Sequence, residues 1–104
     1  MSIPKEKLDQ RTCAAIVCEH IATGRQPIML AERSEPEEEA DSGWQFLCGD
    51  PNEDWTKAHV WSLQEVIDID SSLSPVADLP AGTRLARAAA NDPWEIVPGE
   101  SERQ

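Results

Sequence analysis

The first part of the chain carries two short apolar runs separated by a turn. CAAIVC at 13–18 is apolar throughout and contains two β-branched residues, which predicts a buried strand within residues 13–21. Gly24 in the following ATGRQ can adopt a positive φ, so the chain can reverse direction there. We therefore expect PIMLAER at 27–33 to return as the second arm of a hairpin with the first strand.

A third strand is predicted where large apolar residues recur at every second position. Trp44, Phe46 and Cys48 occupy alternate positions, which places them together on the core side of a sheet. Asp41 can accept a hydrogen bond from the backbone two residues later, and Gly43 tolerates a turn conformation, so a turn opens the strand. The GDPN that follows the strand is a strong turn signal and ends it.

The hydrophobic period becomes helical in WSLQEVIDI at 61–69. Ser62 and Glu65 have the S-x-x-E spacing of a capping box, in which each residue bonds to the backbone of the other. This pattern predicts a short helix. Asp70 is expected to cap a further helical turn or two, which Pro80 ends.

The last part of the chain leaves one alternative open. Residues 83–90 are compatible with a helix by propensity and with a strand by alternation. WEIV at 94–97 alternates and predicts a short strand. Residues 98–104 form a polar tail. Strands, then helices, then strands without βαβ alternation predict an α+β fold. We expect a mostly antiparallel sheet of about four to five strands, with one or two short helices packed on one face.

Composition limits the chain to one domain and favours a protein partner. The 104 residues suffice for a single small core, which we expect to span about residues 13–97. Lys and Arg number 9 and Asp and Glu number 20, so the formal net charge is −11. Such a surface repels nucleic acid phosphates and anionic lipids, so neither nucleic acid nor a membrane is an expected partner. A basic protein partner is favoured, and the oligomeric state is left open.

The start of the sequence has no apolar signal segment, and no stretch is long and apolar enough for a membrane span. A cytoplasmic location is therefore expected.

Cysteine and histidine residues show no spacing typical of a metal or catalytic site. There is no C-x-x-C pair and no H-x₃₋₅-H pair, so no metal site is expected. The thiols lie in apolar runs, and neither a nucleophile elbow nor a phosphate-binding glycine loop is present. We expect a non-catalytic protein without a cofactor, whose cysteines are reduced. The cysteines and histidines of the sequence are Cys13, Cys18, His20, Cys48 and His59.

Acidic residues and tryptophans gather around the third predicted strand. Residues 34–56 contain eight of the twenty acidic residues and no Lys or Arg. Loops 34–43 and 49–57 flank the strand, whose ends lie about 15–20 Å apart, so the loops could form one acidic edge. The residues predicted to bind a partner are Glu37, Glu38, Glu39, Asp41, Trp44, Asp50, Glu53, Asp54 and Trp55.

The tryptophans have more than one interpretation. The alternation around Trp44 favours a core position over a binding role. Trp55 follows an acidic turn outside any apolar pattern, so it either resembles an exposed binding hot spot or covers the core near Trp61. In a third interpretation, all three tryptophans line a pocket for a small ligand or a regulatory molecule.

Several short motifs resemble a bacterial domain family, immunity protein family thirty-three, which belongs to polymorphic toxin systems. The resemblance implies a small α+β protein without catalytic activity that binds and blocks a toxin delivered by a neighbouring cell. Together with the net charge, the resemblance predicts an acidic inhibitor of a basic toxin. The alternative function is a small-ligand or regulatory binding module with a tryptophan-lined pocket. The resemblance covers about residues 13–90 and lies in ER at 32–33, an acidic linker, DSGW at 41–44, GD at 49–50, ID at 69–70 and LPAGTRLAR at 79–87.

Overall fold

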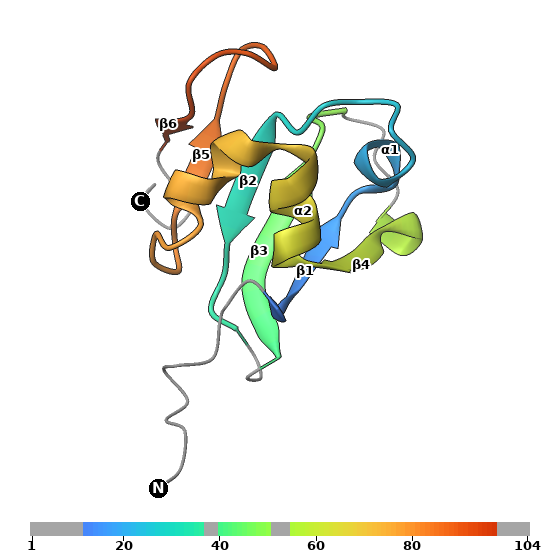
Figure 1. The fold of residues 1–104 in the computed structure, drawn as a ribbon, viewed down its shortest axis with the longest axis vertical. Helices are drawn as coiled ribbons and strands as arrows, with labels where there is room; N and C mark the ends of the chain where they lie inside the picture. Colours follow the sequence, from blue (N-terminus) through green and yellow to red (C-terminus); the bar gives the residue numbers. More distant parts are fainter. Residues whose placement is uncertain (1–11, 37–39, 51–54, 98–104) are drawn as a thin grey trace, which may run out of the picture.

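The computed structural model describes residues 12–36, 40–50 and 55–97, which fold around a six-stranded sheet (Figure 1). The spatial order of the strands is β4-β1-β3-β2-β5-β6. The strands are β1 (Ala14–Val17), β2 (Leu30–Arg33), β3 (Asp41–Leu47), β4 (His59–Ser62), β5 (Arg84–Ala86) and β6 (Glu95–Ile96). The helical elements are α1 (Glu19–Ala22), η3 (Trp55–Lys57), α2 (Leu63–Ile69) and η4 (Ser71–Val76).

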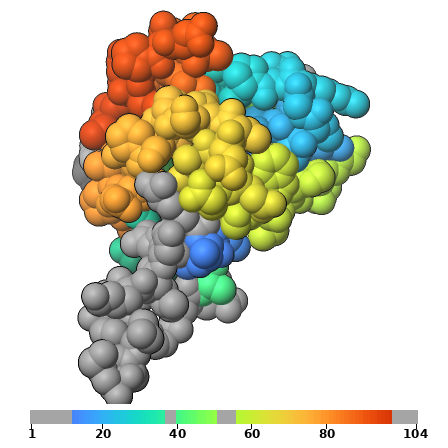
Figure 2. Space-filling model, in the orientation of Figure 1, coloured from blue at the N-terminus to red at the C-terminus, as the bar shows by residue number. Residues whose placement is uncertain are grey.

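The predicted α+β class is confirmed, with six strands in place of about four to five. The sheet is mostly antiparallel: β1 and β3 run parallel, and the other four neighbouring pairs are antiparallel. The helical segments α2 and η4 lie in front of the sheet in Figure 1 and form much of the surface seen in Figure 2. One face of the sheet is thus covered by helical structure, as expected.

The predicted hairpin between residues 13–21 and 27–33 is wrong, because β3 lies between β1 and β2. The chain leaves β1 through a short helix, α1, which the sequence pattern did not predict. Backbone N–H groups of Cys18 and Met29 both donate to carbonyls of β3, at 3.1 and 2.9 Å. The connection therefore crosses the width of one intervening strand, about 10 Å.

The core side of β3 is occupied as the alternation predicts. Trp44 and Phe46 are each 1% exposed, and their rings stack with centroids 5.7 Å apart. The indole Nε1 of Trp44 donates to the carbonyl of Ala77 at 3.1 Å, which ties β3 to the end of η4. Cys48 follows the strand and is partly buried. Among the described residues, the buried hydrophobic ones are Ala15, Val17, Cys18, Ile21, Ile28, Ala31, Trp44, Phe46, Leu63, Val66, Ile67, Leu73, Ala77 and Leu85.

The predicted helix start at Ser62 is confirmed. The Ser62 hydroxyl accepts a bond from the Glu65 N–H at 3.1 Å, and the Glu65 carboxylate accepts from the Ser62 N–H at 2.8 Å. Asp70 then accepts from the Ser72 N–H at 3.1 Å and begins η4, as predicted. These caps satisfy N–H groups that the first helical turn leaves without a partner.

The strands towards the two edges of the sheet agree only in part with the sequence pattern. Residues 84–86 form β5, so the strand alternative holds there, and β6 confirms the strand predicted at 94–97. The sequence pattern does not predict β4. Its first two residues, His59 and Val60, are exposed and form no apolar run, and Trp61 and Ser62 fit the start of the following helix. The polar tail, 98–104, lies outside the described residues.

Within the described ranges, no helix has the length and apolar character needed to cross a membrane.

Candidate functional site

The two acidic loops leave opposite ends of β3. Asp41 is the first residue of the strand, and Asp50 follows its last residue by three positions. Six residue steps of about 3.3 Å separate the strand ends by roughly 20 Å. A partner that touches both carboxylates must therefore extend along the strand. The remaining predicted acidic residues, Glu37, Glu38, Glu39, Glu53 and Asp54, lie outside the described residues, and a single acidic surface stays a prediction.

An exposed apolar pair lies between these two ends, on the face of the sheet opposite the core. Val60 on the edge strand β4 is 72% exposed, and its cross-strand partner Ile16 on β1 is 38% exposed. The next residue in the same row is Gln45 on β3, a partner of Ile16. Since buried neighbours in β1 and β3 point to the core, this row belongs to the opposite face, which we call the open face because Val60 is largely exposed there.

The predicted tryptophans occupy different environments. Trp44 is buried, so it supports the sheet from the core side and does not reach a partner surface. The backbone of Trp55 begins η3. Its side chain is not among those that the structure describes, so its binding role stays a prediction. Trp61 on β4 is partly buried against the core.

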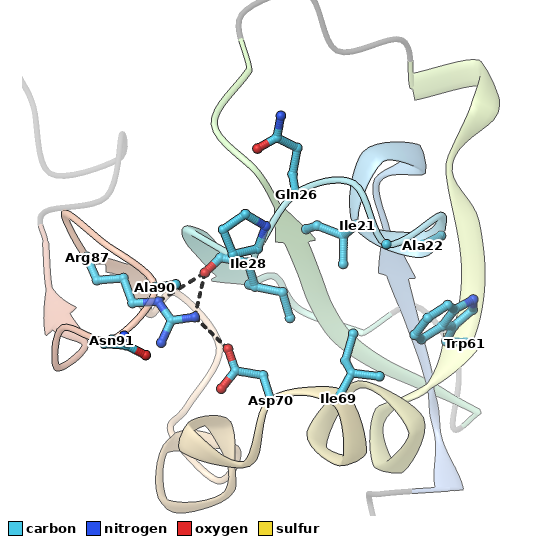
Figure 3. A pocket seen from close by; sticks show the side chains of 12 residues that line it. Ile21, Ala22, Gln26, Ile28, Trp61, Ile69, Asp70, Arg87, Ala90 and Asn91 are labelled. Carbon is cyan, nitrogen blue, oxygen red and sulfur yellow. Dashed lines mark hydrogen bonds and ion pairs between the residues drawn. The ribbon is translucent and has the colours of Figure 1, made fainter.

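A cavity of about 450 Å³ lies beside Trp61, among α1, the loop after it and the end of α2 (Figure 3). Arg87 and Asp70 lie on one side of this cavity and Trp61 on the other. Arg87 Nε and Nη2 both donate to the Ile28 carbonyl, at 3.0 and 2.8 Å, and Nη2 contacts Asp70 at 2.5 Å. The charged pair of the cavity therefore holds three segments of the fold together, which leaves little of its hydrogen-bonding capacity for a ligand.

Arg33 is a second arginine directed towards the backbone. Its Nε donates to the Ser42 carbonyl at 2.9 Å, and Nη1 donates to the Leu79 carbonyl at 2.7 Å. Its guanidinium also lies 5.7 Å from the centre of the Trp44 ring. Arg33 and Arg87 thus use their guanidinium groups to join loops to the sheet.

Three potential metal-ligand side chains meet at the end of the sheet where β1 and β3 finish. The ligand atoms of Cys18, His20 and Cys48 all lie within 4.8 Å of one another. Cys48 Sγ is 3.5 Å from His20 Nδ1, and His20 Nε2 is 3.9 Å from a carboxylate oxygen of Asp50. The sequence pattern does not reveal this cluster, because Cys48 lies 28 positions from His20 in the chain. The parallel pairing of β1 with β3 is what brings them together.

Comparison with protein families identifies a match that covers most of the chain. The model of the immunity protein Imm33 domain matches residues 15–97, which is most of the chain. No match was found among curated proteins or among solved structures. The matched range begins in β1 and extends through β6, so it includes nearly the whole sheet and both ends of β3. This chain belongs to the Imm33 immunity protein domain family.

Proposed function

We propose that this chain is an immunity protein that neutralises a basic bacterial toxin by binding and occluding it, without catalysing a reaction. Membership in the Imm33 family supports a toxin as the partner. The formal net charge of −11 supports a basic one, because opposite charge raises the rate of encounter. Such a protein would act in the cytoplasm of the cell that it protects.

The observation that carries this proposal is the exposed apolar pair between two acidic strand ends. Val60 and Ile16 are neighbours on the open face of the sheet. Asp41 and Asp50 lie towards the two ends of the adjacent strand. Protein interfaces commonly combine an apolar centre with a polar rim. A standard interface of about 800 Å² per partner is roughly 30 Å across, so one toxin surface can span the distance of about 20 Å between the ends.

Substitution of Val60 tests this surface. Val60→Arg places a charge at the centre of the proposed contact, and we expect the equilibrium dissociation constant for the toxin to rise at least about tenfold. Because the side chain is 72% exposed, the substitution should leave the fold intact. Binding would be measured by calorimetry against the toxin domains encoded in the same gene neighbourhood.

Ile96 provides a matched control. It is 70% exposed on β6, at the opposite edge of the sheet, and it pairs with the core-facing Leu85. Ile96→Arg introduces the same charge at a similar exposure but away from the proposed contact. Equal losses of affinity in the two variants would refute the open face as the binding surface, whereas a loss confined to Val60→Arg supports it.

A further inference from the structure

The geometry of the Cys18, His20 and Cys48 cluster agrees with a tetrahedral metal site. Zinc bonds of about 2.3 Å to sulfur and 2.0 Å to nitrogen, at a tetrahedral angle, place the two ligand atoms about 3.5 Å apart. Cys48 Sγ and His20 Nδ1 are 3.5 Å apart. No ligand pair in the cluster exceeds 4.8 Å, against about 3.8 Å for two sulfurs on one zinc ion. A shift of about 1 Å in the ligand atoms, produced by side-chain rotation, would bring them to the distances of a zinc site.

The backbone arrangement explains why these side chains converge. β1 and β3 are parallel neighbours, so their carboxyl ends meet at one edge of the sheet, and Cys18 and Cys48 are the residues that follow the two strands. The Cys18 N–H donates to the Phe46 carbonyl at 3.1 Å, which keeps the two strand ends together. His20 lies in the single turn of α1, two residues after Cys18, and returns towards Cys48. All three ligands therefore lie within a helix or strand or directly next to one.

Asp50 occupies the place of a supporting group for the histidine. Its carboxylate lies 3.9 Å from His20 Nε2, on the opposite side of the ring from Cys48. A histidine that binds metal through one ring nitrogen commonly donates its other N–H to a carboxylate, which fixes the orientation of the ring. Asp50 would thus position His20 for ligation through Nδ1.

We propose that Cys18, His20 and Cys48 bind one thiophilic divalent cation, with Zn²⁺ as the ion that fits best. Two thiolates and an imidazole are soft and borderline ligands that favour zinc over Mg²⁺ or Ca²⁺. On binding, each thiol releases a proton to solvent, and the two negative sulfurs neutralise the dication. A neutral centre is suited to a site in which Cys18 is fully buried. Since His20 and Cys48 are only partly buried, water can complete the fourth position.

Zinc affinity of the full chain and of single variants tests this proposal without any toxin. We expect one Zn²⁺ per chain, measured by competition with a chromophoric chelator. Cys48→Ser and His20→Gln should each weaken binding by at least about 100-fold, and Asp50→Asn by about 10- to 100-fold. The substituted ligands are partly buried, and circular dichroism would verify that the variants fold.

Cys13 supplies the matched control, because it is a partly buried thiol that lies before β1, at the other end of that strand. Cys13→Ser should retain the affinity of the unaltered chain. Co²⁺ in place of Zn²⁺ should give sulfur-to-metal charge-transfer absorption and the intense visible bands of a tetrahedral site, both reduced in Cys48→Ser. Equal affinities of Cys13→Ser and Cys48→Ser, absence of stoichiometric Zn²⁺ binding, or a Co²⁺ spectrum without the thiolate bands would overturn the proposal.

Discussion

Gly43 determines how the first acidic loop enters β3. Its φ is +83°, a backbone conformation that residues with a side chain rarely adopt. A Cβ atom at this position would lie much closer to the Ser34 carbonyl oxygen than the sum of their van der Waals radii allows. The Ser34 N–H donates to the Gly43 carbonyl at 2.8 Å, and Asp41 accepts from the Gly43 N–H at 2.8 Å. The close approach of these segments therefore requires glycine.

Alanine at residue 43 should lower the free energy of unfolding by about 3 kcal/mol, because strain at positive φ adds to the contact with the Ser34 backbone. Gly24→Ala is the control: its φ is +79°, but nothing lies within 4 Å of a Cβ there, so about 1 kcal/mol is expected. Urea denaturation measures both values. Equal losses would show that the contact with Ser34 has no part in the effect.

Individual residues differ in how well their roles follow from the sequence. The Asp41–Gly43 turn is local, so the spacing of the two residues predicts its hydrogen bond correctly. Arg87 is different, because its partners Ile28 and Asp70 lie 59 and 17 positions away. A local pattern contains no information about such contacts.

At the scale of elements, α2 depends on the cap at its first turn. Ser62→Ala removes the side-chain acceptor of the Glu65 N–H and should destabilise the protein by about 1 kcal/mol. Ser71→Ala, at an exposed serine in the first turn of η4, is the control and should change stability by less than about 0.5 kcal/mol. Thermal or urea denaturation of the two variants compares them; a loss as large in the control would argue against the capping role.

Elements with a strong local pattern were predicted well, and their partners in the sheet were not. The alternation around Trp44 and the capping box at Ser62 specify β3 and α2 without tertiary information. Strand order is non-local: a turn-forming sequence after the first strand suits a hairpin, but the connection through α1 leaves room for β3. The Ile16–Val60 pair and the cluster of Cys18, His20 and Cys48 could not be predicted for the same reason, because both depend on which strands are neighbours.

At the scale of the whole molecule, charge reversal separates the contributions of the two acidic ends. Lysine at Glu37, Glu38 and Glu39 changes the charge of the segment before β3, and lysine at Glu53 and Asp54 changes that of the segment after it. If both ends contact a basic toxin, each set should slow association by about tenfold at low salt, and high salt should reduce the difference. Stopped-flow fluorescence provides the association rates.

Reversal of Asp68 and Asp92 is the control for the second set, because it produces the same change in net charge at exposed carboxylates elsewhere. An equal effect of the control would mean that net charge, and not the position of the loops, governs encounter. A slower rate from only one set would restrict the contact to that end of β3.

The central claim, that this chain neutralises a toxin by binding it, is tested most directly by protection of growing cells. Toxin domains encoded in the same gene neighbourhood would be expressed with and without the chain, and growth would be compared with binding of the purified proteins. We predict that the unaltered chain restores growth and binds one of these toxins, and that Val60→Arg weakens both binding and protection while Ile96→Arg keeps them. Toxicity that persists beside abundant, folded chain, with no complex formed with any of these toxins, would contradict the account.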